Sequence, residues 1–414
     1  MPSKASDDFN IIIVGAGPSG LLLALLLAKQ SIKVTILERS HEIDKQPRAS
    51  FYSEPARHEF RRAGIMDDVK SKAFLASGVS WRHIDGTYIC GIHSEGLPDD
   101  MRQVSLPLDE LLPLIASHLE KYPSAEILLN HEVTGIGQDD KHAWVDVKTP
   151  DGEKKFSATY IIGCDGGNSK IRRELFGPGN FPGKTWDKQI VATNVYYPRL
   201  KEFNWTTSSN FMIDPKHFSM IAQISNDGML RATYAEEGNL TREEMLVRQP
   251  EKYKAFVPGA PEPSEYKMVN FSPYKIHQRC AEKLRVGKFL LAADAAHLCN
   301  PFGGMGLTGG FADVGGLYDC LYGIYSGQAD DSILDKYDEI RREKYWKVID
   351  PISSGNIMRL WDPSPEAIGN DDFFNLLKKA EADKTGKMSR DMALGANTVM
   401  HDFTQYYRTK PAES

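Results

Sequence analysis

The chain contains 414 residues, of which 41% are hydrophobic and 26% are charged, and its formal net charge is −6. This length exceeds a single ordinary domain and predicts two or three structural units around a large core. The negative charge offers no electrostatic footprint for a nucleic acid or an anionic membrane, so we expect no nucleic acid among the main partners.

The N-terminal part carries an apolar stretch at residues 11–28, which is interrupted by glycines and by Pro18. We therefore expect no integral membrane segment, and because no targeting segment is visible we expect a cytoplasmic protein. The five cysteines are scattered and form no CxxC pair, a pattern that predicts reduced thiols. We expect neither a disulfide framework nor a zinc site, and no other metal.

The first informative segment is a glycine-rich turn that follows a short apolar run. Residues 11–14 predict a strand buried on both faces of a parallel sheet, and the turn Gly-Ala-Gly-Pro-Ser-Gly comes directly after it. In such a turn Gly15 allows the bend and Gly17 lets the backbone approach a pyrophosphate. Gly20 lets the next helix pack closely, and the N–H groups that open this helix point at the phosphates.

The residues after the turn complete a βαβ unit. Residues 21–30 predict a helix and residues 33–37 a second strand, which ends at Glu38, eighteen residues past Gly20. A carboxylate at this place can accept hydrogen bonds from a ribose diol. The order strand, glycines, helix, strand and acid therefore predicts a seat for the adenosine half of a dinucleotide.

Further along the chain two patterns alternate. The segments expected next are a helix at 54–69, a strand-like region at 79–90, an amphipathic helix at 106–120 and strands at 125–129, 131–138 and 143–149. From about 183 to 275, short alternating strands with turn signals predict an antiparallel sheet. The chain then re-enters the first domain near Ile276, and a charged helix at 332–347 precedes a polar tail.

A second apolar run at residues 160–163 is followed by Asp165 and Gly166 and then by a helix. Asp165 could simply cap that helix, or it could take part in binding the cofactor. A third run, residues 288–293, ends at Asp294, and five glycines between 303 and 310 follow it. Asp294 stands at the carboxyl end of its strand, where ligands of open α/β sheets bind. Two carboxylates at strand ends together with the first glycine turn suit a long cofactor that lies across the sheet.

The three motifs GAGPSG, CDGGNS with Arg172, and ADAAHLCNPFGGMG together resemble the single-component FAD-dependent aromatic monooxygenases typified by para-hydroxybenzoate hydroxylase. The resemblance covers about residues 9–345. It implies an α/β fold: a Rossmann-like FAD-binding domain with an inserted antiparallel-sheet substrate domain and a C-terminal helical region. The implied boundaries are 9–75, 103–182 and 276–345 for the FAD-binding domain, 76–102 and 183–275 for the substrate domain, and 346–414 for the helical region and polar tail.

The resemblance also implies roles for individual residues. Gly15, Gly17 and Gly20 would hold the FAD pyrophosphate, and Glu38 the adenine ribose. Asp165 would handle FAD and NAD(P)H, and Asp294 would bind the ribityl chain or the pyrophosphate. The remaining residues implied to contact FAD are Arg39, Arg48, Arg102, Gln103, Pro301, Gly304, Gly306 and Leu307, of which Pro301, Gly304, Gly306 and Leu307 would border the isoalloxazine ring.

Two positions depart from the family pattern. The family usually has Gly-Asp where this chain has Ala293-Asp294, and usually has Asn where this chain has Thr308. The extra methyl group of Ala293 could crowd a close approach of the backbone to the cofactor. Neither departure removes a charged group.

The activity implied by the resemblance is that of an FAD-dependent monooxygenase. NADPH or NADH would reduce FAD, and O2 would react through a C4a-(hydro)peroxyflavin to hydroxylate a hydrophobic or aromatic small molecule. Epoxidation, Baeyer-Villiger insertion, and a flavin oxidase or reductase of the same fold stay open as alternatives, as does a non-catalytic nucleotide-binding protein. We expect a monomer or a homodimer.

The antiparallel sheet offers polar residues that could steer a substrate proton. Alternation along its strands makes His217, Tyr234 and Tyr197 candidates for catalysis, while Arg231 and Thr233 point the opposite way from Tyr234. Each of the three could equally be a core or surface residue.

Overall fold

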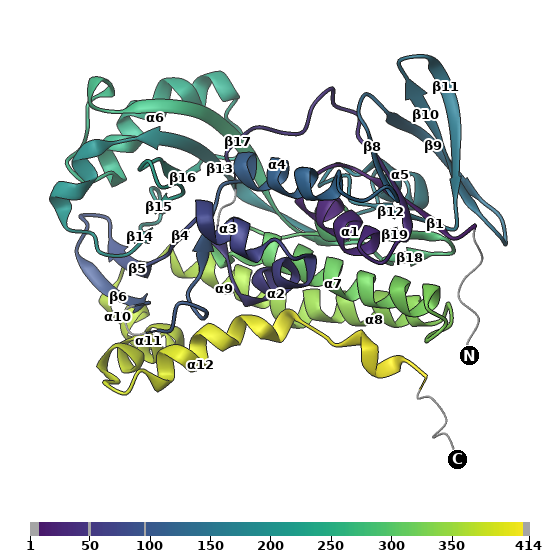
Figure 1. The fold of residues 1–414 in the computed structure, drawn as a ribbon. Coiled ribbons are helices and arrows are strands. Elements are labelled where there is room, and N and C mark those ends of the chain that lie inside the picture. Colours follow the sequence, from purple (N-terminus) through teal and green to yellow (C-terminus); the bar gives the residue numbers. More distant parts are fainter. Residues whose placement is uncertain (1–7, 49–50, 95–96, 409–414) are drawn as a thin grey trace.

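The structure, a computed structural model, describes residues 8–48, 51–94 and 97–408. Residues 1–7, 49–50, 95–96 and 409–414, the last of which belong to the polar tail, lie outside this description. In Figure 1 two large sheets stand at opposite ends of the molecule, and most of the helices lie beneath and between them.

The first large sheet has six strands in the order β18-β19-β12-β1-β2-β8. All neighbours in it run parallel except β18, which is antiparallel to β19. The side chains of residues 11–13 are buried, as expected for a central strand with helices on both faces. The strands are β1 (Asn10–Val14), β2 (Lys33–Leu37), β8 (Ala125–Leu128), β12 (Tyr160–Gly163), β18 (Arg285–Val286) and β19 (Phe289–Leu291).

Long apolar helices cover this sheet, and α1 packs against both α4 and α7. These helices are α1 (Pro18–Ala28), α4 (Leu108–Leu119) and α7 (Met305–Tyr325). The main core contains the buried side chains of this layer. Two smaller sheets flank it: β9 (Glu132–Gln138), β10 (Ala143–Thr149) and β11 (Gly152–Ala158) in one, and β3 (Phe51–Tyr52), β7 (Val104–Ser105) and β4 (Phe74–Leu75) in the other.

The second large sheet has eight strands in the order β20-β17-β13-β16-β15-β14-β5-β6. Only β14 and β5 run parallel; the other neighbouring strands are antiparallel. The strands are β5 (Gly78–His83), β6 (Tyr88–His93), β13 (Gly183–Tyr196), β14 (Ser209–Ile213), β15 (Ser219–Gln223), β16 (Leu230–Glu236), β17 (Lys267–Cys280) and β20 (His297–Leu298).

The two faces of the eight-stranded sheet are covered by different elements. Helix α6 (Arg242–Phe256) packs on one face, which we call the α6 face, over a cluster that includes Val191 and Tyr234. The opposite face, which we call the Arg231 face, packs Phe211 and Phe218 against Phe302 and the C-terminal helices. Because side chains alternate along a strand, each strand supplies one set of residues to each face.

Two helical features differ from the sequence-based expectation. The helix expected at 54–69 is two helices, because Gly64 adopts a left-handed conformation (φ 75°) that ends the first of them. Helix α6 was not anticipated, although its start has a sequence signal. Thr241 Oγ1 accepts a hydrogen bond from Glu244 N (3.3 Å), and Glu244 Oε2 accepts one from Thr241 N (2.8 Å), which together form a capping box.

The C-terminal part is helical, and its last described residues run along α7 and α8. The helices not yet given are α2 (Glu54–Ala63), α3 (Met66–Lys72), α5 (Lys170–Phe176), α8 (Ile333–Lys344), α9 (Asp350–Arg359), α10 (Pro365–Asn370), α11 (Asp372–Ala382) and α12 (Lys387–Gly395). Short 3-10 helices occur at Pro198–Phe203, Pro263–Glu265, Ala293–Ala295, Pro301–Gly303, Ala396–Val399 and Phe403–Tyr406, and a π-helical turn at Tyr345–Ile349.

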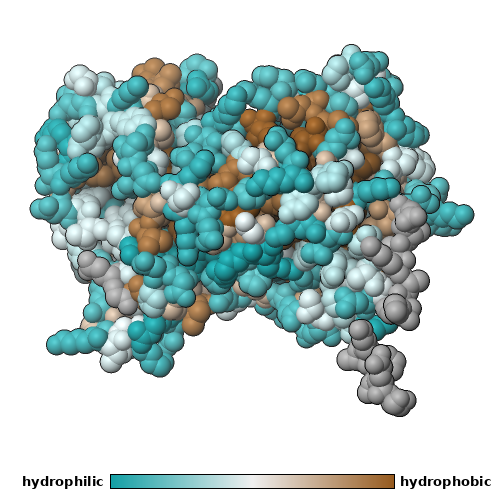
Figure 2. Space-filling view, in the orientation of Figure 1, coloured by the Kyte–Doolittle hydropathy of each residue, from teal (hydrophilic) through white to brown (hydrophobic). Residues whose placement is uncertain are grey.

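The surface in Figure 2 is mostly hydrophilic, and the apolar residues that show on this face gather near its middle, over α4. None of the helices in the described ranges is long and apolar enough to cross a membrane. The domain boundaries given above stay predictions. The eight-stranded sheet extends beyond the expected boundary at 275, because its strand β17 runs on to Cys280 and its strand β20 comes after the last strand of the parallel sheet.

Candidate active site

The glycine-rich turn lies where the parallel strands end. Gly15 has a φ of 106°, and a Cβ at this position would lie 2.5 Å from the carbonyl oxygen of Cys164. A Cβ at Gly20 would lie 2.1 Å from the carbonyl oxygen of Gly15, so helix and turn approach each other too closely for any side chain. A Cβ at Gly17, by contrast, would meet no atom of the described residues within 4 Å. Gly17 therefore faces open space at the N-terminus of α1.

Glu38 supports this turn from the neighbouring strand. Its Oε2 accepts a hydrogen bond from Ala16 N (2.8 Å), and its Oε1 accepts one from Ser40 N (2.9 Å). A carboxylate oxygen can accept more than one hydrogen bond, so the group can hold the turn and still receive ribose hydroxyls. Arg39 and Arg48 are exposed, and the Arg48 guanidinium forms an ion pair with Asp44 (2.9 Å).

The second motif folds as a helix cap. Asp165 Oδ1 accepts a hydrogen bond from Ser169 Oγ (2.5 Å), and Oδ2 accepts from Lys170 N (2.6 Å) and Ile171 N (3.1 Å). Arg172 donates to the carbonyl oxygens of Gly167 (2.7 Å) and Ala295 (2.8 Å), which ties this motif to the third one. The sequence left two roles open for Asp165, capping a helix and binding the cofactor, and this geometry favours the first.

The third motif presents Asp294 from a strained turn. Ala293 has a φ of 55°, a left-handed conformation that costs an L-residue about 1–2 kcal/mol. Asp294 follows it and is exposed to solvent, and within the described ranges its carboxylate has no hydrogen-bond partner. Although the residue is accessible to solvent, the protein atoms around its carboxylate exclude some of the water, which raises its pKa; the charge of Asp313 adds to that shift, and the charges of His297 and Arg48 oppose it. Asp294 therefore offers an unpaired carboxylate at the end of β19.

Helix α7 begins directly after Pro301–Gly303. Gly304 is its N-cap, with a φ of 63°, and no side chain caps the first N–H groups of the helix. The N–H groups of Gly306 and Leu307 are thus available, and the helix dipole makes this end attractive to negative charge. Thr308, where the family usually has Asn, donates from Oγ1 to the carbonyl oxygen of Gly304 (3.0 Å).

Arg102 and Gln103 reach the same neighbourhood through the small sheet. Tyr52 of β3 pairs with Val104 of β7, the residue after Gln103. Ser53 follows Tyr52, and its Oγ lies 3.3 Å from Thr308 Oγ1 in the first turn of α7. Arg102 donates from Nη2 to the carbonyl oxygens of Leu75 and Ala76 (3.4 Å each), and its Nε is buried without a partner.

These residues fit FAD. Two helix N-termini without side-chain caps supply N–H donors for negative charge, and the space beside Gly17 admits a close approach of phosphate. Glu38 and Asp294 supply acceptors for hydroxyl groups at two separate strand ends. Cys299, close in sequence to the proposed ring site, is a poor nucleophile, because burial raises the pKa of its thiol to about 12.

The Arg231 face carries a polar group that the sequence reasoning did not select. Asn194 Nδ2 donates to the carbonyl oxygen of Pro47 (2.6 Å), and Arg231 Nη1 donates to Asn194 Oδ1 (3.2 Å). Tyr274 interacts with the same guanidinium, and burial lowers the pKa of Arg231. Within the described residues no carboxylate pairs with Arg231, although interior arginines are usually paired. The sequence signal for this polar group was the alternation along the strand, which places Arg231 on the other face of the sheet from Tyr234.

The three residues considered for catalysis lie elsewhere. Tyr234 is fully buried on the α6 face, where its ring packs against Phe256 at 5.3 Å. Tyr197 is in the same cluster and donates its hydroxyl hydrogen to the carbonyl oxygen of Pro258 (2.8 Å). His217 precedes β15, and the charge of Lys252 on α6 acts on it. The structure does not bring these residues to the site at the strand ends.

The chain is similar to known proteins along most of its length. A family model described as "FAD binding domain" matches residues 8–351. Para-nitrophenol 4-monooxygenase of Pseudomonas sp. (strain WBC-3) is 33% identical over 378 residues, which cover 91% of this chain and 92% of that protein. 6-hydroxy-3-succinoylpyridine 3-monooxygenase of Pseudomonas putida is 32% identical over 378 residues, covering 90% of this chain and 94% of that one.

Solved structures are similar over nearly the whole chain. The crystal structure of p-nitrophenol 4-monooxygenase from Pseudomonas putida has a TM-score of 0.87 and 31% identity, and covers 94% of this chain and 98% of that chain. A ternary complex of aklavinone-11 hydroxylase with FAD and aklavinone has a TM-score of 0.74 at 20% identity and shares the fold.

Proposed function

The chain belongs to the single-component FAD-dependent aromatic monooxygenases, and on that premise we propose that its substrate is a small phenol that is anionic at neutral pH, with 4-nitrophenol as the first candidate. An electron-withdrawing substituent makes such a phenol acidic. One relative that matches along almost the whole chain is named for this compound.

The observation that carries the proposal is the interior arginine on the Arg231 face. A guanidinium that is partly desolvated and has only neutral partners gains free energy when it meets an anion. Arg231 has Asn194, Tyr274 and the carbonyl oxygen of Pro47 around it, all of which are uncharged. A phenolate or nitro oxygen would supply the missing negative partner.

Apolar side chains on the same face suit the ring of such a substrate. Phe302, which follows Pro301 in the turn before α7, packs against Phe218 (ring centroids 5.5 Å apart) and Phe211 (6.3 Å). Met220 packs against the same cluster. Side chains of this kind exclude water from a reacting aromatic ring.

Bound FAD supplies the electrons taken from NADPH or NADH and the activated oxygen. The residues of the chain bind and orient: Gly17 and the N-terminus of α1 hold phosphate, and Asp294 holds hydroxyl groups. The N–H groups after Gly304 stabilise negative charge at the ring. In the overall reaction one oxygen atom of O2 enters the substrate, the other leaves as water, and NAD(P)H is oxidised.

The experiment is a turnover assay of the FAD-loaded protein with 4-nitrophenol, using NADPH and NADH separately. Substrate-stimulated oxidation of the nicotinamide, with ¹⁸O from ¹⁸O2 in the product, supports the proposal. Stimulated oxidation that yields only hydrogen peroxide contradicts it and indicates oxidase chemistry. A cytoplasmic location and a monomeric or homodimeric state are part of this proposal, and size-exclusion chromatography with light scattering measures the second.

A matched pair of variants tests the role of Arg231. Arg231→Met should raise KM for 4-nitrophenol at least about tenfold, because a charge-assisted hydrogen bond contributes roughly 1.5–3 kcal/mol. Arg242→Met is the control, because the Arg242 guanidinium lies over Phe271 on the α6 face (5.6 Å from the ring centroid). Equal KM values in the two variants would rule out Arg231 as the anion-binding group.

A further inference from the structure

We propose that the segment Ala396–Val399 belongs to the cofactor-binding apparatus, because Arg341 links its backbone to Asp313, and Asp313 holds the turn that presents Asp294. Arg341 and Asp313 are positioning residues in this scheme. The scheme rests on the assignment of Asp294 to FAD made above.

The first link joins Asp313 to the strained turn. Asp313 is fully buried in α7, and its Oδ2 accepts a hydrogen bond from Ala293 N (2.8 Å). The same helix makes room for the methyl group of Ala293, because its Gly310 has no side chain: a Cβ at Gly310 would lie only 2.8 Å from Ala293 Cβ. Helix α7 therefore both admits Ala293, where the family usually has glycine, and holds its N–H group in the left-handed conformation.

The second link fixes Asp313 itself. His297 Nε2 lies 2.8 Å from Asp313 Oδ2, and Arg341 Nε donates to Oδ1 (2.6 Å). Burial alone would raise the pKa of Asp313, but the charges and hydrogen bonds of these two partners lower it to about 2. Arg341 thus stabilises the buried negative charge of Asp313, and removing one partner of such a buried pair destabilises the folded protein.

The third link carries the contact to the C-terminal segment. The Arg341 side chain is fully buried, and its Nη1 donates to the carbonyl oxygen of Val399 while Nη2 donates to that of Gly309 (3.3 Å). The planar guanidinium has donors in three directions, and lysine could not reach all three acceptors at once. The orientation of Arg341 toward Asp313 is therefore set in part by the backbone at Val399.

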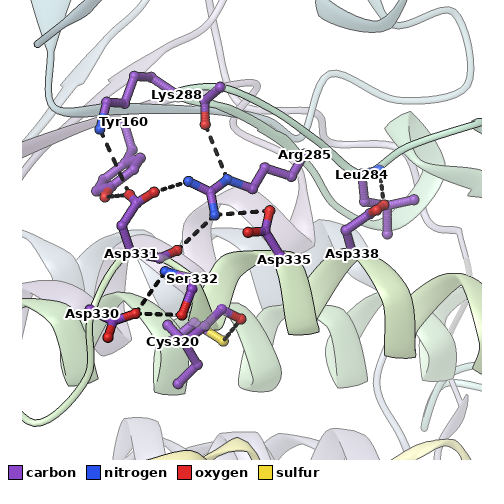
Figure 3. Close-up of polar contacts among 12 residues, drawn as sticks. Tyr160, Leu284, Arg285, Lys288, Cys320, Asp330, Asp331, Ser332, Asp335 and Asp338 are labelled. Atoms are coloured by element: carbon purple, nitrogen blue, oxygen red, sulfur yellow. Dashed lines mark hydrogen bonds and ion pairs between the residues drawn. The ribbon is translucent and has the colours of Figure 1, made fainter. Parts of the chain in front are cut away.

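Helix α8, which carries Arg341, is anchored at its other end as well. Figure 3 shows Arg285 of β18 between Asp331 and Asp335; its Nη1 lies 3.1 Å from Asp335 Oδ1 and donates to the carbonyl oxygen of Asp331 (2.7 Å). Leu284 N donates to Asp338 Oδ1 (2.5 Å) in the same view. With its first turns tied to the parallel sheet, α8 gives Arg341 a fixed base.

The test compares FAD binding in three variants of the full chain. Arg341→Met should raise the dissociation constant of FAD at least about tenfold. This factor corresponds to about 1.4 kcal/mol of binding free energy, lost because the strained turn is no longer held in place. Lys344→Met is the matched control: Lys344 Nζ donates to the carbonyl oxygen of Thr398 (2.7 Å), so this variant loses a contact with the segment but keeps the link to Asp313. It should change the constant less than twofold.

A double-variant cycle separates positioning from general stability. Glycine adopts the left-handed conformation without strain, so Ala293→Gly should restore most of the FAD affinity lost in Arg341→Met and change the Arg341 background little. Fluorescence titration of the apoprotein gives the dissociation constants, and calorimetry of the apoprotein gives Tm. If Ala293→Gly changes the constant by the same factor in both backgrounds, or if Arg341→Met lowers Tm and leaves FAD affinity unchanged, the proposal is wrong.

Arg341→Lys provides a second route if Arg341→Met does not fold, because it keeps the charge but not the three-way contact. It should weaken FAD binding and leave the apoprotein folded by circular dichroism. Normal FAD affinity in folded Arg341→Lys contradicts the link. These measurements need no phenol, so failure of 4-nitrophenol as a substrate leaves their outcome untouched.

Discussion

Asn194 and Arg231 face each other across β13 and β16, and both side chains reach the carbonyl oxygen of Pro47, at 2.6 and 3.5 Å. Pro47 precedes Arg48 in the stretch that follows β2, so these two residues join the eight-stranded sheet to a segment that continues from the six-stranded sheet. The Arg48 charge acts on both Arg231 and Asp294. The same contact thus sets the Arg231 face against the segment that carries Arg48.

Two glycines of the first turn should respond differently to the same substitution. Gly17→Ala should leave the stability of the apoprotein nearly unchanged, because the new methyl group meets no atom of the part of the chain that the structure describes, but FAD binding should weaken severely. Gly20→Ala should destabilise the apoprotein by about 1–3 kcal/mol, because its methyl group overlaps the carbonyl oxygen of Gly15. Urea unfolding and FAD titration measure the two effects. Equal loss of stability in both variants would contradict the geometry.

Asp294 should matter to the cofactor and not to the apoprotein. Its side chain has no hydrogen-bond partner within the described residues, so Asp294→Asn should leave Tm of the apoprotein unchanged or slightly higher. FAD affinity should fall at least about tenfold, since a hydrogen bond from a hydroxyl to a carboxylate contributes roughly 1.5–3 kcal/mol. Glu110→Gln, at an exposed position of α4, serves as the control. Unchanged FAD affinity in Asp294→Asn would remove this residue from the site.

Tyr234→Phe should leave turnover unchanged. The hydroxyl group of Tyr234 is buried on the α6 face without a hydrogen-bond partner among the described residues, so its removal relieves an unsatisfied polar group. We expect equal or slightly higher stability and the same kcat and KM for the substrate, measured by nicotinamide oxidation. A tenfold loss of kcat at constant FAD content would restore Tyr234 as a catalytic candidate.

Glu59 should make stability depend on pH near neutrality. This residue of α2 is buried, and desolvation raises its pKa from 4.5 to about 7, against the opposing charge of Arg62. A raised pKa in the folded state means that the contribution to stability is complete below pH 4.5 and is lost as pH rises through about 7. A shift of this size corresponds to about 3 kcal/mol.

The variant Glu59→Gln isolates this effect, because it removes the titrating group and keeps the shape. The free energy of unfolding of the parent protein, relative to Glu59→Gln, should fall between pH 4.5 and 7 and stay level above that range. Urea unfolding at a series of pH values measures the difference. A difference that is constant with pH, or that rises, would show that Glu59 does not titrate in this way.

The local parts of the site could be predicted from the sequence. The close packing at Gly20 follows from the spacing of a strand, a turn and a helix, and the structure shows it; the role of Gly17 toward a phosphate stays a prediction. Family membership and the FAD-dependent monooxygenase activity implied by the three motifs are confirmed by the comparisons. Such motifs can be recognised in a sequence because all their residues lie within a few positions of one another.

The parts that depend on tertiary packing could not be predicted. Alternation along β16 correctly separates Tyr234 from Arg231, but it does not say which face α6 will cover, and α6 itself was not anticipated. The link from Asp313 to Arg341 and on to Val399 joins residues of three separate elements, each of which reads as ordinary helix or loop. No local spacing encodes such a contact.

The hydrogen bonding of β20 to β17 has a consequence for the precision of the enzyme. Arg279 and Cys280 at the end of β17 pair with Leu298 and His297, only a few residues before the turn at Pro301–Gly303. The eight-stranded sheet and the turn before α7 are therefore joined by one continuous stretch of backbone. A displacement of β20 would therefore move the end of β17 and this turn together.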